Sequence, residues 1–244
     1  MNHIKKRSFW IVILLYLTLT PYIFTSFSQE SIKESTGTWM VIHGSNQISE
    51  NWSIPTVMIL REYNLTEETE FGFFRTGLTY KIKPNLKVTG GIAYLDTQPF
   101  DHDEREKLTT QFWVYEELSI KSSENWAQRL RFEHRWITGP NGNTNNDRLR
   151  YRLQYSKPLF DNTYLKGFNE SFYDISLGKY NQNRFYIGLG QKISKDICIE
   201  VGYLKNHVGK NNYNRIRMSL LFKTRLFKGK PESLTNHQKL SNNQ

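Results

Sequence analysis

Residues 126–138 read WAQRLRFEHRWIT, and this stretch decides the fold class. One parity carries Trp126, Gln128, Leu130, Phe132, His134 and Trp136, and the other carries Ala127, Arg129, Arg131, Glu133 and Arg135. Such alternation predicts a β-strand with one mostly apolar face and one charged face. The segment is about twice as long as an ordinary strand of a soluble protein. The length therefore favours a strand that crosses a membrane.

Two later segments repeat this pattern. In residues 147–158, Leu149, Tyr151, Leu153 and Tyr155 alternate with Arg148, Arg150, Arg152 and Gln154. In residues 214–227, Ile216, Met218, Leu220, Phe222 and Leu226 alternate with Arg215, Arg217, Ser219, Lys223 and Arg225. In a soluble sandwich the charged faces would meet water, whereas in a membrane barrel they point into the lumen and the apolar faces meet lipid.

The whole chain divides into eleven such segments. They are residues 37–46, 52–64, 71–82, 86–97, 108–121, 126–138, 147–158, 163–176, 184–193, 197–207 and 214–227. Short connections at 47–51, 83–85, 122–125, 159–162 and 194–196 alternate with mostly longer ones at 65–70, 98–107, 139–146, 177–183 and 208–213. These features predict an all-β, antiparallel outer-membrane β-barrel of about 10–12 strands. Because bacterial single-chain barrels have even strand numbers, we expect ten or twelve.

The two ends of the chain differ from the strand region. Residues 1–28 have the parts of a secretory signal peptide: Lys5-Lys6-Arg7, an apolar run from Phe9 to Leu19, and Ser26-Phe27-Ser28 before a cleavage site near Ser28/Gln29. The apolar run is too short for a spanning helix, which needs ~20 residues. We expect a short lead at 29–36, the barrel at 37–227, a polar tail at 228–244, and an outer-membrane location in a Gram-negative cell.

Composition limits the partners. The formal net charge is +10, but most cations alternate along strands instead of forming a basic arm, so we expect no nucleic acid. Cys198 is the only cysteine, which excludes an intrachain disulfide. No motif for a metal or another cofactor is recognisable. The expected partners are outer-membrane lipids, the barrel-assembly machinery and, for a ligand-binding barrel, a small anionic ligand.

The inward parity of the strands predicts a lumen charge network. Its members are Arg129, Arg131, Glu133, Arg135, Arg148, Arg150, Arg152, Glu170, Glu200, Arg215 and Arg217. Arg and Glu on neighbouring strands can pair across the ladder and fill a narrow lumen. This favours a structural or ligand-binding barrel with a largely plugged lumen. A small anion-preferring pore is the alternative interpretation.

An enzymatic alternative rests on residues 43–46, His-Gly-Ser-Asn. His43 and Ser45 lie two residues apart and share one face of a strand, as a Ser/His lipid acyl hydrolase on a barrel wall requires. The element resembles the His-x-Ser-Asn motif of outer-membrane deacylases and phospholipases. No third member of a triad is identifiable by spacing, so we do not expect the chain to be an enzyme.

Several stretches together resemble a known family. They are Gln128–Trp136, Arg148–Leu153, Lys157-Pro158-Leu159, Phe168-Asn169-Glu170, Asn183–Gly188 and Glu200–Tyr203. In this order they are similar to the uncharacterised outer-membrane barrels grouped as domain of unknown function 2490, which are common in Bacteroidota. The resemblance runs from Trp39 to Phe227 and implies the barrel and its compartment, but no activity. The tail after Phe227 and the loosely matched first strand depart from the family pattern.

Overall fold

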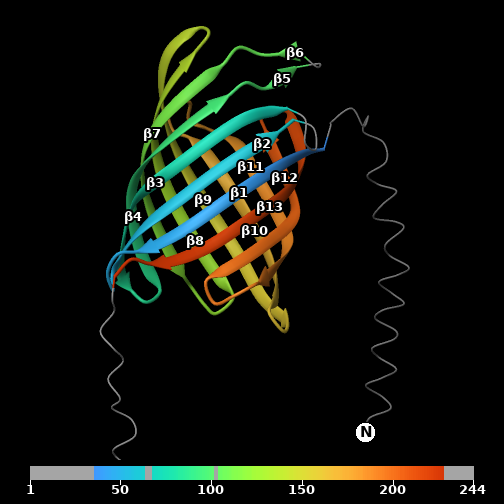
Figure 1. Ribbon diagram of the computed structural model, residues 1–244. Coiled ribbons are helices and arrows are strands. Elements are labelled where there is room, and N and C mark those ends of the chain that lie inside the picture. Colours follow the sequence, from blue (N-terminus) through green and yellow to red (C-terminus); the bar gives the residue numbers. More distant parts are fainter. Residues whose placement is uncertain (1–35, 64–67, 102–103, 228–244) are drawn as a thin grey trace, which may run out of the picture. The chain divides into compact units, whose positions relative to one another are not determined.

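Eleven long strands form one closed barrel in the computed structural model, which describes residues 36–63, 68–101 and 104–227 (Figure 1). The strands of the barrel are β1 (Gly37–Gln47), β2 (Trp52–Glu62), β3 (Thr69–Lys83), β4 (Leu86–Thr97), β7 (Thr109–Lys121), β8 (Trp126–Gly139), β9 (Gly142–Phe160), β10 (Thr163–Asp174), β11 (Lys179–Lys192), β12 (Ile197–Val208) and β13 (Asn211–Arg225). A separate hairpin, β5 (Phe100–Asp101) and β6 (Glu104–Arg105), stands in the connection after β4. The predicted all-β barrel is confirmed.

Some expectations fall beyond these ranges. The signal peptide at 1–28, nearly all of the lead at 29–36 and the tail at 228–244 lie outside the described residues. Across the part of the chain that is described, no helix is long and apolar enough to cross a membrane.

Each of the eleven predicted segments is one strand of the barrel, but the expectation of an even number is wrong. With eleven strands the first and last run in the same direction, so the barrel closes by parallel pairing. β1 and β13 pair in unbroken register from Gly37↔Arg215 to Gln47↔Arg225. All other neighbouring strands of the barrel are antiparallel.

The two ends of the barrel differ in their connections. We call the end with the connections 47–52, 83–86, 121–126, 160–163 and 192–197 the turn end, and the opposite end the loop end. The expected loop at 139–146 is instead a tight turn, because β8 and β9 extend to Gly139 and Gly142. Gly142 has a φ of 104°, which a glycine adopts without steric cost.

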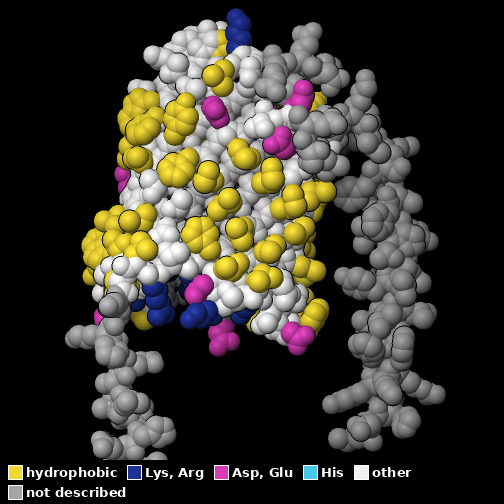
Figure 2. Space-filling view, viewed as in Figure 1, with side chains coloured by type: hydrophobic (Ala, Val, Ile, Leu, Met, Phe, Trp, Pro, Cys, Tyr) yellow, Lys and Arg dark blue, Asp and Glu magenta, His cyan; other side chains and the backbone are white. Residues whose placement is uncertain are grey.

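The outer wall carries an aliphatic band between aromatic pairs. Near the turn end, Trp52 lies against Tyr80 and Trp126 against Tyr155, with ring centroids 4.7 and 4.9 Å apart. Near the loop end Phe112 lies 5.9 Å from Trp136. Between these heights the exposed side chains include Met40, Ile42, Met58, Leu60, Leu78, Ile92, Leu130, Leu153, Ile187, Ile199, Val201 and Met218. Figure 2 shows hydrophobic side chains over the visible wall and most charged ones near its two ends.

One polar cluster interrupts this outer wall. The His134 ring lies 3.0 Å from an Asp147 carboxylate oxygen and 4.0 Å from a Glu116 carboxylate oxygen. All three side chains are more than a third exposed. The outward parity of β8 is thus not purely apolar.

Tyrosine rings lie over glycine pairs on the inner wall. Gly77 of β3 faces Gly91 of β4, and a Cβ on either would meet the Tyr115 hydroxyl, at 2.8 and 2.6 Å. The Tyr115 hydroxyl donates a hydrogen bond to the Thr76 carbonyl at 3.2 Å. These glycines therefore provide the space in which a large ring packs flat against a curved sheet.

Candidate functional site

The register of β8, β9 and β10 places like charges directly opposite one another in the lumen. Arg131 faces Arg150 and Arg129 faces Arg152 across the β8–β9 ladder. Like charges in that position repel. Carboxylates at diagonal or neighbouring positions lie between these arginines. The opposed arginines are therefore stable only as parts of a network of ion pairs.

Glu133 and Glu170 are the two fully buried centres of this network. Glu133 accepts hydrogen bonds from Arg148 Nε at 2.8 Å and Arg150 Nη1 at 2.6 Å, and Arg131 Nη1 is 3.5 Å away. Arg150 uses its second nitrogen, Nη2, to bind Glu170 at 3.0 Å.

Glu170 gathers three further arginines. Arg152 Nη2 donates to it at 2.9 Å, Arg129 forms a close ion pair with it, and Arg184 Nη1 lies 4.0 Å away. The structure places Glu170 in the lumen, where it links β8, β9 and β11.

The other predicted members pair elsewhere. Arg215 Nη2 binds Glu70 at 3.0 Å, whereas Arg217 Nη1 lies 3.7 Å from Glu200. Arg135 contacts Asn146, and its Nη2 is 3.9 Å from Asp174. The charge network therefore extends around the lumen and beyond the β8–β9 pair.

Two glycines allow side chains of β10 to contact Glu200 on β12. Gly188 and Gly190 of β11 stand between β10 and β12 and carry no side chain into the lumen. Lys166 Nζ and the Tyr164 hydroxyl consequently reach across β11 and donate to Glu200 at 2.7 and 2.8 Å.

Several network residues were missed from the sequence. Glu117 joins Arg131 Nε at 2.7 Å and Arg75 Nη1 at 3.2 Å, and Glu70 joins Arg61 Nε at 2.5 Å. The other missed members are Asp174, Lys166 and Arg184. The inner faces of β2 and β3 mix apolar side chains with single charges, so the charges there give no alternating pattern. Glu117 has the same parity along β7 as Trp113 and Tyr115. This alternation was the one sequence feature that could have placed it in the lumen.

Cations outnumber carboxylates in this network. Among the described residues, its ion pairs join Arg61, Arg75, Arg129, Arg131, Arg135, Arg148, Arg150, Arg152, Lys166, Arg184, Arg215 and Arg217 to Glu70, Glu117, Glu133, Glu170, Asp174 and Glu200. Twelve cations against six carboxylates leave an excess of six positive charges.

The network leaves a cavity of about 840 Å³ inside the barrel. Among the described residues, fourteen Lys or Arg side chains line it, against two carboxylates, Glu70 and Glu117. Glu133, Glu170 and Glu200 are at most 1% exposed, beneath the cations. The surface that the cavity presents to a ligand is thus strongly cationic.

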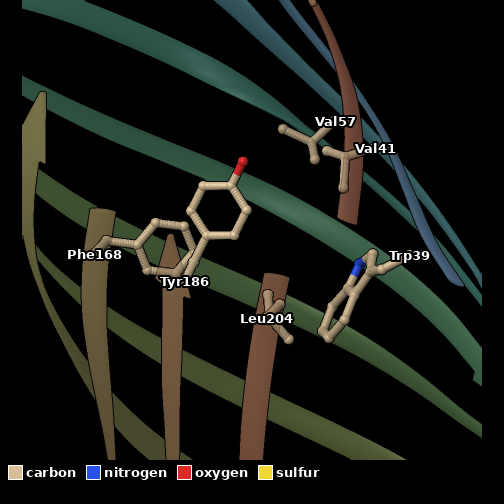
Figure 3. Close-up of a cluster of buried hydrophobic side chains, with 6 residues drawn as sticks. All are labelled: Trp39, Val41, Val57, Phe168, Tyr186 and Leu204. Atoms are coloured by element: carbon tan, nitrogen blue, oxygen red, sulfur yellow. The ribbon is translucent and has the colours of Figure 1, made fainter. Parts of the chain in front are cut away.

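An apolar cluster borders the same cavity (Figure 3). It consists of Trp39, Val41, Val57, Phe168, Tyr186 and Leu204, with Ile59 and Phe73 packed against it. Phe168 and Tyr186 stack with centroids 5.0 Å apart, and Arg152 lies 4.1 Å above the Phe168 ring. Guanidinium groups on aromatic faces are favourable cation–π contacts, so the charged and apolar parts of the lumen form one continuous lining.

The structure places both enzymatic candidates on the inner face of β1. His43 lines the cavity, whereas Ser45 does not. No hydrogen bond between the two side chains is present in the described part of the chain. The geometry of an activated serine is therefore absent from this pair as it stands.

Fold and lumen define a closed β-barrel with a cationic interior. The model of the family described as "Protein of unknown function (DUF2490)" matches residues 36–217. Because the match covers well over half of the chain, the protein belongs to this family. Neither the curated proteins nor the solved structures include a significant match.

Proposed function

We propose that this chain is an integral outer-membrane β-barrel whose lumen binds a small anionic ligand. The outer wall supports the location. Trp126 and Trp136 lie ten residues apart on β8, which corresponds to about 25 Å along the barrel axis at a usual strand rise and tilt. An apolar band of that height between aromatic girdles is typical of outer-membrane barrels. The apolar run of residues 9–19, followed by small residues, supports export to that compartment.

The charge excess around the cavity carries the ligand proposal. Charges inside a lumen are less well solvated than charges in bulk water, so an excess of cations over carboxylates there favours a bound anion. Arginine forks also bind carboxylate and phosphate groups through two parallel hydrogen bonds. The carboxylates of the wall satisfy only part of this capacity, because each is shared among several cations.

A small anion-preferring pore is the second candidate, because the cavity lining reaches both ends of the barrel. Asn85 and Lys121 line it at the turn end, and Thr97 and Val208 line it at the loop end. A ligand site narrowed by the arginine network would carry little steady current. An open path would carry an anion-selective current.

One set of measurements on the purified barrel in lipid separates these functions. We expect saturable binding of inorganic phosphate by calorimetry, little steady conductance in planar bilayers, and no release of fatty acid from phospholipid or lipid A. Stable anion currents that fall in Arg131→Gln would instead establish the pore. Fatty-acid release abolished by Ser45→Ala or His43→Ala would establish the hydrolase.

The location is tested separately. We expect the mature chain in the outer-membrane fraction, with a faster mobility on unboiled than on boiled gels. Recovery from the cytosol or the inner membrane would refute the proposed location.

A further inference from the structure

The cavity has two chemically different walls. From β1, β2 and β3 it is lined by Trp39, Val41, Val57, Ile59, Phe71 and Phe73. From β8 and β9 it is lined by six arginines. Arg61, Glu70 and Arg75 of the same strands interrupt this apolar surface. The lumen of a membrane barrel is ordinarily polar, so an apolar wall of this extent inside it requires an explanation beyond anion binding.

Arg184 marks the junction of the two walls. Its guanidinium lies 4.8 Å from the Trp39 ring centroid and 4.7 Å from that of Phe172. The carboxylate with which it pairs, on Glu170, is 4.0 Å away. Arg184 Nε donates a hydrogen bond to the Asn206 side-chain oxygen at 3.1 Å, so the hydrogen-bonding capacity that remains beside the apolar wall is that of Nη1.

Trp39 adds a second, independent observation at the same junction. Its side chain is only 3% exposed, yet the indole Nε1 has no hydrogen-bond acceptor within the described residues. A buried donor without an acceptor costs free energy. The lining covers that nitrogen, so an oxygen atom of a bound molecule would satisfy it once a neighbouring side chain of the cavity shifts.

We propose that the ligand is an amphipathic organic acid, a molecule with one acidic group and an apolar body. This proposal rests on the anion-binding function above and specifies its ligand. The acidic group binds at Arg184 and the neighbouring arginines, and the body lies against the wall of Trp39, Val57 and Phe73. An inorganic anion would leave that wall facing water, and a neutral hydrocarbon would leave the arginines without an acceptor. A cavity of about 840 Å³ has the size of a small-molecule site.

Bromine quenching of tryptophan fluorescence tests this position. Trp52, Trp126 and Trp136 are exposed on the outer wall, so replacing each by Phe leaves Trp39 and Trp113 as the strand tryptophans, both lining the cavity. In nanodiscs of zwitterionic lipid, ω-bromododecanoate should quench them saturably, whereas a brominated phospholipid should not. We expect ω-bromododecanol, which lacks the charge, to bind about tenfold more weakly.

Two variants distinguish the contributions of the arginine wall and the apolar wall to ligand binding. Arg184→Gln should weaken both ω-bromododecanoate and phosphate. Val57→Thr combined with Ile59→Thr makes the apolar wall more polar with little change in size, and should weaken ω-bromododecanoate about fivefold or more while leaving phosphate binding unchanged. Gel mobility without boiling checks that every variant is folded.

The outcomes distinguish the two proposals. If phosphate binds but ω-bromododecanoate does not quench, or if the alcohol binds as well as the acid, the amphipathic ligand is wrong and anion binding stands. An affinity for ω-bromododecanoate that the Val57 and Ile59 changes leave unaltered also refutes it. If neither phosphate nor ω-bromododecanoate binds, the proposed function itself fails.

Discussion

Glu133 is the single residue whose loss should most disturb the lumen. Glu133→Gln removes a buried charge that binds Arg148 and Arg150 and lies within 3.5 Å of Arg131. Removing one partner of a buried ion pair leaves the other charges uncompensated and typically costs about 3–5 kcal/mol. We expect a loss of that size in the free energy of unfolding, measured by urea titration in detergent micelles with gel mobility as the readout.

Glu116 provides the matched control for that prediction. It lies on β7, which pairs with the strand β8 that carries Glu133. Its side chain points to the outer wall and is 60% exposed. Glu116→Gln removes an exposed charge beside His134 in the polar cluster of the outer wall, so we expect stability to change by less than about 0.5 kcal/mol. Equal losses in the two variants would show that the ion pairs of the lumen do not determine stability.

For single residues, the sequence predicted the lumen charges that alternate regularly with outward-facing side chains. It missed the lumen charges that stand in no such pattern. Arg129, Arg131 and Glu133 stand out because each is flanked by apolar neighbours in a regular period. Arg61 and Arg75 stand in strands whose inner neighbours, such as Ile59 and Phe73, are apolar too. Arg61 pairs with Glu70 on β3 and Arg75 with Glu117 on β7, and the register that brings these side chains together cannot be read from local periodicity.

Among the elements, β9 gives the clearest test of which face is which. Tyr151 is 41% exposed on the outer wall, and Arg150 beside it is buried in the lumen. A charge on a lipid-facing wall near the membrane centre costs roughly 2–4 kcal/mol, so with the outer wall in lipid, as we propose, Tyr151→Arg should lower the stability of the folded barrel by that amount. Arg150→Leu should cause a smaller loss of stability, because Glu133 still pairs with Arg148 and Glu170 still pairs with Arg152. Folded yield and unfolding in micelles measure both, and the reverse order would invert the assignment of inside and outside.

All eleven strands were predicted, since each is bounded by turn residues and has an apolar face. The ends of β9 were not. Asn143 to Asn146 form a polar run that resembles a loop, but they pair with the end of β8. The apolar lumen wall of β1 to β4 also escaped prediction, because a strand that is apolar on both faces has no charged parity to mark its inside.

Over the whole molecule, strand number determines where the chain enters and leaves the barrel. With eleven strands, β1 begins at the loop end near Thr36 and β13 finishes at the turn end near Leu226. An even-stranded barrel would bring both positions to the same end. Periodicity cannot decide this, because it identifies strands one at a time and contains no information on how the first meets the last.

The two arrangements differ in which side of the membrane reaches each position. In a Cys198→Ser background, single cysteines replace Thr36, Leu226, Leu177 at the loop end and Glu124 at the turn end, all of them exposed. We expect a membrane-impermeant maleimide added to intact cells to label Thr36→Cys and Leu177→Cys alike, and to label Leu226→Cys and Glu124→Cys only after the outer membrane is opened. Joint labelling of Thr36→Cys and Leu226→Cys from one side would contradict the parallel seam between β1 and β13. It would restore an even number of strands, and the lumen register that places Arg215 against Glu70 would then have to be redrawn.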